Sequence, residues 1–242
     1  MESPTKSESI CRDPTVVEED DVDDDPPLLS SHALAALKEF LAEQTQPSTE
    51  PHLENGVSED SEVALVAEDW RLSQFWYDRV TAETVADEVL TLCQNFDSPR
   101  VACIACPTLY TYLKKIGPNV SAQLLEYDKR FSQHGSEFTF YDYNEPEELP
   151  MELKHNFQII VADPPYLSKE CLEKVTHTIS FLAQHSESYL LLLTGEVQAE
   201  RAAELMGFHT CGFRPHHSSK LGNEFRLFTN YNPGTRLGGW EQ

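Results

Sequence analysis

The sequence predicts an α/β protein built on a seven-stranded, mostly parallel sheet that ends in an antiparallel hairpin. Three observations predict it. From residue 63 onward, short apolar runs typical of buried strands alternate with segments of helical periodicity. The third and fourth apolar runs each end directly on an aspartate, as expected where strands meet a binding crevice. The last two runs, 210–214 and 224–231, leave no room for a helix between them, so they should pair antiparallel.

The expected elements follow in chain order. The first helix spans 81–90 and begins at Thr81 with a weak capping box. Two further helices are expected at 109–116 and 196–206, and Gly207 provides the stop signal of the second. Besides the final hairpin, the predicted strands are 100–106, 122–127, 138–141, 157–162 and 189–193.

The chain divides near residue 62 into an acidic extension, 1–62, and a folded domain, 63–242. The extension holds 17 of the 41 acidic residues and 3 of the 18 basic ones, so its net charge is −14 against −9 for the remainder. A block of like charge at 18–25 and a Pro, Ser, Thr and Glu-rich stretch at 46–61 predict disorder. Between them, helical spacing behind a Ser cap predicts a short helix near 31–43.

Composition also restricts the partners and the compartment. A net charge of −23 and a pI near 4.6 repel phosphate backbones, which disfavours nucleic acid as a partner. The sequence contains no stretch long and apolar enough to span a membrane, and no apolar signal segment precedes the cysteines. We therefore expect a cytoplasmic protein with reduced thiols. The six cysteines are scattered over the chain: Cys11, Cys93, Cys103, Cys106, Cys171 and Cys211.

Cys103 and Cys106 form a C-x-x-C that has two interpretations. A zinc or redox site would need further ligands, but a second pair at metal-ligand spacing is missing from the sequence. Both cysteines lie in or directly after an apolar strand-like run, which favours buried small side chains. We therefore predict no metal site.

The tetrapeptide Asp163-Pro164-Pro165-Tyr166 is the most informative motif in the chain. It directly follows a predicted buried strand, where open α/β sheets place their ligands. Two prolines fix the backbone and provide no N–H, which frees the Pro164 carbonyl for a ligand. This carbonyl and the Asp163 carboxylate together offer two acceptors for a primary amine, and Tyr166 adds a flat aromatic face. The alternative is an ordinary turn after a strand, in which Asp163 caps the next segment.

Acidic residues also follow two other predicted strands. Glu126 or Asp128 follows the second, and Asp142 follows the third. In a dinucleotide-like fold, a carboxylate at the first of these places accepts ribose hydroxyls, and one at the next receives an adenine amine. The chain lacks a G-x-G-x-x-G turn for a pyrophosphate, which disfavours NAD. S-adenosylmethionine has a sulfonium and no phosphate, so it suits this pattern.

Five blocks in order carry a resemblance to a known family of enzymes. The chain resembles the elongation factor 1A lysine methyltransferase 1 family, whose members were formerly assigned as adenine-specific DNA methyltransferases. The resemblance covers roughly residues 28–233, and it implies the class I methyltransferase fold. The sequence departs from the general methyltransferase pattern in lacking a glycine-rich first turn. The blocks are 69–77, 126–131, 140–144, 161–168 and 223–226.

The resemblance implies transfer of a methyl group from S-adenosylmethionine to a lysine ε-amine of translation elongation factor 1A. It places Asp163, Pro164, Pro165 and Tyr166 at the reacting amine. It implies a set of cofactor-binding residues made of Glu126 or Asp128 for the ribose, Asp142 and Tyr143 for the adenine, and Cys106 and Pro107 for the methionine part. Gln74, Phe75 and Trp76 either close over the cofactor or wall the lysine channel; the alternative is an aromatic cluster that seals the N-terminal edge of the sheet.

Two other functions are compatible with the same residues. The motif also suits methylation of an exocyclic amine of adenine or cytosine, with Tyr166 stacked on a flipped base. The acidic charge and the absence of a basic run argue against it. A non-catalytic binding protein that kept the fold is the second alternative, and the intact Asp163-Pro164-Pro165-Tyr166 argues against that.

Overall fold

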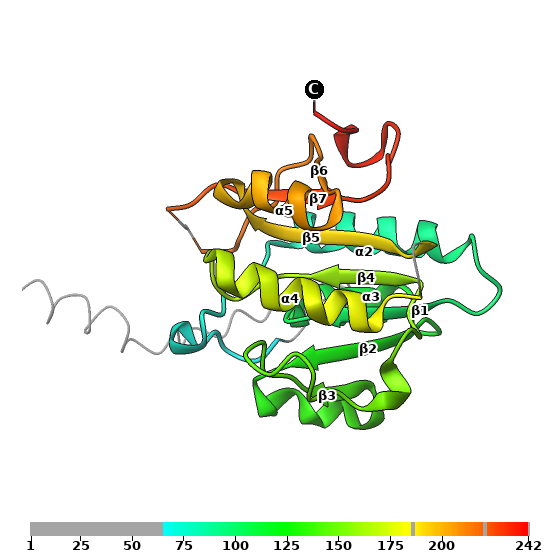
Figure 1. Ribbon diagram of the computed structural model, residues 1–242. Coiled ribbons are helices and arrows are strands. Elements are labelled where there is room, and N and C mark those ends of the chain that lie inside the picture. The colour runs from blue at the N-terminus through cyan, green and yellow to red at the C-terminus, as the bar shows by residue number, and fades with distance from the viewer. Residues whose placement is uncertain (1–64, 185–186, 220–221, 242) are drawn as a thin grey trace, which may run out of the picture. The chain divides into compact units, whose positions relative to one another are not determined.

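A seven-stranded sheet runs through the computed structural model, with its strands in the order β3-β2-β1-β4-β5-β7-β6 (Figure 1). The structure describes residues 65–184, 187–219 and 222–241. Strands β1 to β5 pair with one another in parallel, and β7 runs antiparallel to both β5 and β6, which confirms the predicted mixed sheet. The strands are β1 (Arg100–Ile104), β2 (Ser121–Glu126), β3 (Phe138–Phe140), β4 (Ile159–Ala162), β5 (Tyr189–Gly195), β6 (His209–Thr210) and β7 (Phe225–Thr229).

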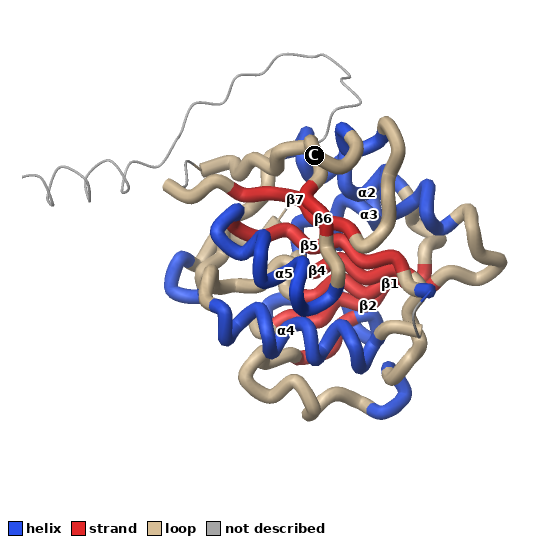
Figure 2. The backbone as a smooth tube through the Cα atoms, turned by 45° about the horizontal axis from the view of Figure 1, so that its top comes forward, coloured by secondary structure: helices blue, strands red, loops and turns tan. Residues whose placement is uncertain are grey.

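Helices cover both faces of this sheet, as Figures 1 and 2 show. Helices α2 (Arg79–Cys93) and α3 (Pro107–Ile116) lie on one face, and α4 (Lys169–Leu182) and α5 (Ala199–Met206) on the other. Short 3-10 turns occur at Trp70–Leu72, Lys129–Glu137, Met151–Leu153, Glu196–Gln198 and Arg236–Gly238. Among the described residues, no helix has the length and apolar character needed to cross a membrane.

The central strands are apolar at nearly every buried position because helices cover both of their faces. In β1, Val101 and Cys103 face the core under α2 and α3, while Ala102 and Ile104 face the core under α4 and α5. The same alternation holds in β4 and β5. This explains why these runs are continuous in the sequence and do not alternate with polar residues.

Helix α4 is absent from the predicted series. Ser168 caps its first turn, accepting a hydrogen bond from the Cys171 amide at 3.1 Å. Its buried face, which includes Leu172, Val175 and Ile179, has ordinary helical spacing. The helix connects β4 to β5 and makes this crossover a regular βαβ unit.

Several predicted boundaries were wrong in detail. Helix α2 begins at Arg79, and its cap is Asp78, whose carboxylate accepts from the Thr81 amide at 2.8 Å, so Thr81 is not the cap. Helix α5 begins at Ala199, after a 3-10 turn, and Gly207 ends it as predicted with φ of 66°. Strand β6 stops at Thr210 because the next residues pair with the C-terminal segment instead. The predicted helix near 31–43 and the boundary at residue 62 lie outside the described residues.

Candidate active site

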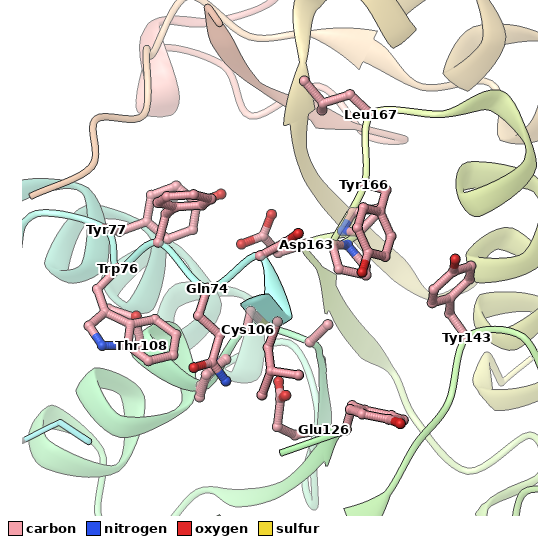
Figure 3. A pocket seen from close by; sticks show the side chains of 18 of the residues that line it. Gln74, Trp76, Tyr77, Cys106, Thr108, Glu126, Tyr143, Asp163, Tyr166 and Leu167 are labelled. Atoms are coloured by element: carbon pink, nitrogen blue, oxygen red, sulfur yellow. The ribbon is translucent and has the colours of Figure 1, made fainter. Parts of the chain in front are cut away.

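A cavity of about 710 Å³ opens where β1, β2 and β4 end at the same edge of the sheet. Its size is typical of pockets that enclose a small organic ligand. The close-up in Figure 3 shows side chains from several separate segments converging on it. Its lining comes from 71–77, 105–108, 126–127, 141–144 and 163–167, together with His217, Gly222, Asn223 and Phe225.

All four residues of the Asp163-Pro164-Pro165-Tyr166 motif line the cavity. The Asp163 amide donates to the Ile104 carbonyl at 3.0 Å, which extends the pairing of β4 with β1 by one residue. The two prolines then lead the chain out of the sheet. The Tyr166 ring is 44% exposed and meets the Tyr143 ring edge-on at 5.7 Å.

Asp163 lies between Tyr77 and Tyr166 (Figure 3). Burial raises the pKa of the Asp163 carboxyl well above its usual range, and the nearby carboxylate of Glu126 raises it further. The Tyr77 hydroxyl faces Asp163 and opposes this effect through an interaction looser than a standard hydrogen bond. The site therefore holds a carboxyl whose negative charge is poorly compensated by the protein.

Glu126 ends β2 and is the second such carboxyl. It is 7% exposed and accepts a hydrogen bond from the Asp128 amide at 3.0 Å. Burial, with the charge of Asp128 adding to it, raises the pKa of Glu126 to about 7. Within the described part of the chain, no cationic side chain forms an ion pair with Glu126. A half-buried carboxyl, that of Asp163, and a buried one, that of Glu126, lack cationic partners among the described residues, which favours a ligand that brings its own hydrogen-bond donors or positive charge.

Asp128, the other residue predicted for the ribose, does not line the cavity. Its carboxylate accepts from Gln74 at 2.9 Å and from the Arg130 guanidinium at 2.8 Å. Although burial opposes them, these hydrogen bonds lower the pKa of Asp128. Because its oxygens are already held by protein donors, the geometry favours Glu126 for the ribose.

Gln74 lines the cavity, but its polar atoms are already occupied. Its Nε2 donates to Asp128, and its Oε1 accepts from the Asp69 amide and the Arg130 guanidinium, each at 3.0 Å. Gln74 therefore ties the segment before α2 to the end of β2. Trp76 lines the cavity and also packs edge-on against Phe131 at 6.2 Å, so its position is compatible with both sequence interpretations.

Asp142 and Tyr143 line the cavity at the end of β3. The Asp142 carboxylate accepts from the Asn144 amide at 2.8 Å. The Tyr143 ring lies under the Lys174 ammonium, 5.7 Å from it. These positions put a carboxylate and an aromatic ring in the same cavity as Glu126, as a purine nucleoside would require.

The first turn reaches the cavity without glycine. Ala105 adopts a left-handed conformation with φ of 53°, at a cost on the order of 1 kcal/mol for a residue with a Cβ. Cys106 and Pro107 follow and line the cavity, and burial raises the pKa of Cys106, so its thiol is neutral. Thr108 also lines the cavity, and its buried hydroxyl has no hydrogen-bond partner among the described residues. That hydroxyl is available to a ligand.

The C-x-x-C does not form a separate site. Cys103 and Cys106 are each 1% exposed and pack in the apolar core, in agreement with the apolar interpretation. Neither forms a disulfide with another described cysteine. In the residues that the structure describes, no three His, Cys, Asp or Glu side chains are grouped as metal ligands would be.

The sequence interpretation missed the wall opposite Tyr166. Tyr77, His217, Asn223 and Phe225 all line the cavity. The Tyr77 and His217 rings stack at 4.4 Å, and Phe225 meets His217 edge-on at 4.6 Å. Tyr77 and the segment 223–226 belong to the recognised blocks, but nothing local in the sequence shows that the chain after β6 returns to the segment before α2.

S-adenosylmethionine fits this lining. The carboxylate of Glu126 suits a pair of ribose hydroxyls, the unpaired Thr108 hydroxyl suits a polar group, and two uncompensated carboxyls suit a cationic sulfonium. The volume is also sufficient for a nucleoside and a side chain to be held together.

Comparison with known proteins agrees with this geometry. Residues 68–233 match the family described as "Probable N6-adenine methyltransferase". The human protein named "EEF1A lysine methyltransferase 1" is 44% identical over 218 residues, which cover 89% of this chain and 97% of that protein. The mouse protein of the same name is 46% identical over 214 residues, covering 88% and 95%.

Among solved structures, the chain is similar to the branched-chain polyamine synthase from Thermus thermophilus in complex with N4-aminopropylspermidine and 5'-methylthioadenosine. The sequence identity is 13%, the TM-score is 0.48, and the match covers 80% of this chain and 62% of the other.

Proposed function

Because the chain belongs to the EEF1A lysine methyltransferase 1 family, it is a protein-lysine N-methyltransferase that uses S-adenosylmethionine, and we propose that its substrate is a lysine of translation elongation factor 1A. The observation that carries the proposal is the placement of Asp163, Pro164 and Tyr166 at the carboxyl end of β4, in one cavity with the carboxyl of Glu126, which forms no ion pair with a described residue.

We assign the cofactor side of the cavity to the ends of β1, β2 and β3. Glu126 accepts the ribose hydroxyls, Asp142 and Tyr143 hold the adenine, and the turn containing Cys106 and Pro107 lines the methionine part. Trp76 closes the wall beside them. When bound, S-adenosylmethionine supplies an electrophilic methyl group on a sulfonium.

Asp163 and the Pro164 carbonyl form the amine side. A free lysine has a pKa of about 10.4, so it arrives as an ammonium and must lose a proton before its nitrogen has a lone pair. The positive charge of the arriving ammonium opposes the effect of burial and favours the carboxylate form of Asp163, which attracts it. The proton is then lost to water at the mouth of the cavity. Two fixed acceptors then hold the N–H groups and aim the lone pair toward the cofactor side. The Tyr166 ring packs against the lysine stem.

We further propose that the protein acts in the cytoplasm, because elongation factor 1A works there in translation. The name of the matching family supports a second candidate, methylation of adenine in nucleic acid. The charge of this chain opposes it, since residues 63–242 carry a net −9 and would repel a phosphate backbone.

A labelled methyl-transfer assay tests the proposal. Purified elongation factor 1A, total RNA and genomic DNA are offered separately to the protein with labelled S-adenosylmethionine. We expect label in elongation factor 1A at a lysine and none after Asp163→Ala, while Glu204→Ala on the exposed side of α5 keeps full activity. Label in nucleic acid alone would replace the proposal with the adenine reaction.

A further inference from the structure

We infer that Tyr77 is a positioning residue for the methyl transfer, because its buried hydroxyl holds the Asp163 carboxylate in the orientation that receives the lysine amine. This inference rests on the proposed function and adds a residue to its amine side.

The placement of the hydroxyl is the first observation. Tyr77 is 4% exposed, lines the cavity and directs its hydroxyl at Asp163 (Figure 3). That hydroxyl is buried and lacks a standard hydrogen bond to any described residue. A buried hydroxyl without a full hydrogen bond is costly, and Asp163 is the acceptor in front of it. In the inferred contact, the Asp163 carboxylate accepts a hydrogen bond from this hydroxyl.

The chain fixes the Tyr77 ring from behind. Tyr77 forms a backbone bridge with His217, and their rings stack at 4.4 Å with an interplanar angle of 29°. Hydrogen bonds from the Asp78 amide to the His216 carbonyl and from the Ser218 amide to the Trp76 carbonyl, each 2.9 Å, flank this bridge. The segment 216–218 therefore clamps the segment 76–78, and the tyrosine cannot swing out of the cavity.

The stack itself carries no charge at physiological pH. Burial lowers the pKa of His217 to about 4, so the imidazole stays neutral. Burial also raises the pKa of Tyr77 well above its usual range, so the phenol stays protonated and acts as a donor. Tyr77 thus presents a permanent O–H to Asp163.

The groups that face Asp163 come from four other elements. Besides Tyr77 they are Cys106 after β1, Glu126 at the end of β2, and Cys171 in α4. Both thiols are kept neutral by burial, and Glu126 disfavours the Asp163 charge. Tyr77 is the group in this set that favours the carboxylate. With one Asp163 oxygen held by Tyr77, the other oxygen is free for the amine.

The test is Tyr77→Phe, which keeps the ring and its stack. We expect kcat to fall about 10- to 100-fold, the loss typical of one hydrogen bond to a charged group. The acidic limb of the kcat/KM profile should move to higher pH by about one unit, because the Asp163 carboxylate loses its donor. The dissociation constant for S-adenosylhomocysteine should stay unchanged.

The matched control is Tyr231→Phe. It also removes a tyrosine hydroxyl, one that donates a hydrogen bond of 2.9 Å to the Glu88 carboxylate and does not line the cavity. This control should leave the acidic limb where it is in the unmodified protein. An unchanged limb in Tyr77→Phe, with or without a loss of kcat, would overturn the inference, since a merely structural role does not move it.

A second readout does not depend on the substrate. The infrared carboxyl band of Asp163 is identified in the cofactor-free protein by its loss in Asp163→Asn, and its intensity is followed against pH. In Tyr77→Phe the band should titrate at higher pH, and His217→Ala should shift it by less in the same direction. If the band shifts while elongation factor 1A takes no label, the proposed substrate fails and the Tyr77 contact stands. If the Asp163 band titrates at the same pH in Tyr77→Phe as in the unmodified protein, the contact between Tyr77 and Asp163 is refuted.

Discussion

Two buried glutamates at similar depth serve opposite purposes in this molecule. Glu88 on α2 is 3% exposed and accepts from the Tyr231 hydroxyl at 2.9 Å and from the Arg236 guanidinium at 2.7 and 3.1 Å. Glu126 is 7% exposed, receives a backbone amide, and has its pKa raised to about 7. The first glutamate joins α2 to the C-terminal segment, whereas the second faces a cavity.

Arg226 in β7 extends the comparison. It is 1% exposed, and three carboxylates pair with it, from Glu196 at 3.1 Å, Glu224 at 3.9 Å and Glu241. Asp163, by contrast, has a tyrosine hydroxyl and another acid for neighbours. Glu88 and Arg226 are therefore paired with opposite charges, whereas Glu126 and Asp163 at the cavity form no ion pair with any described residue.

Among the variants considered, Asp163→Ala should have the largest effect on methyl transfer. Without the carboxylate the amine is neither attracted nor aimed, so we expect kcat to fall by about 10³-fold. Affinity for S-adenosylhomocysteine, measured by calorimetry, should persist because the cofactor side is untouched. Asp163→Asn keeps one acceptor oxygen and should lose less activity. Loss of cofactor binding in both variants would mean that Asp163 belongs to the cofactor side instead.

Glu126→Gln should have the second largest effect, a weaker binding of the cofactor. Replacing the carboxylate removes charge-assisted acceptance from the ribose hydroxyls, which corresponds to an affinity loss of about 10- to 100-fold. Glu88→Gln is the matched control, since it makes the same change at a buried carboxylate away from the cavity. Cofactor affinity is measured by calorimetry. If both variants bind the cofactor as tightly as the unmodified protein does, Glu126 does not contact it.

Gln74→Ala should have the smallest effect. It removes the hydrogen bonds of Gln74 to the Asp128 carboxylate and to the Arg130 guanidinium, so the Trp76 wall loosens. We expect a three- to tenfold rise of KM for S-adenosylmethionine, less than the full worth of bonds to charged groups, because Gln74 acts on the cofactor only through Trp76. The control is Gln123→Ala. The Gln123 side-chain amide lies on β2 outside the cavity and donates to the Thr139 hydroxyl at 3.0 Å, so its removal should leave KM unchanged. A KM change of the same size in both variants would contradict the view that Gln74 holds the Trp76 wall in place.

The sequence predicted the parts of the site that follow strands directly. Asp163 and Glu126 are visible because each ends an apolar run, and the apolar runs themselves reflect burial on both faces of the sheet. The choice between Glu126 and Asp128 could not be made from the sequence. It depends on the hydrogen bonds that Arg130 and Gln74 donate to the Asp128 carboxylate in the folded structure.

Long-range contacts set the limit of the sequence prediction. The stacking of Tyr77 on His217 joins residues far apart in the chain, and no local pattern encodes it. Helix α4 was missed although Ser168 caps it and its apolar spacing is regular, so that signal was present in the sequence. Ala105 adopts in the first turn a left-handed conformation that favours glycine, and no local pattern in the sequence indicates this.

The free energy of unfolding of Glu126→Gln and Glu88→Gln, measured in urea at pH 4 and pH 8, tests the comparison most directly. Folding raises the pKa of Glu126 from 4.5 to about 7, so the stability that this group contributes is present below 4.5 and is lost as the pH rises through 7. At pH 8, Glu126→Gln should therefore be more stable than the unmodified protein by up to about 3 kcal/mol, a gain that disappears at pH 4. Glu88→Gln should instead be less stable at pH 8 by about 1.5 to 3 kcal/mol, because it breaks a paired charge. A loss of stability at pH 8 in both variants would contradict the account, since Glu126 would then support the fold as Glu88 does.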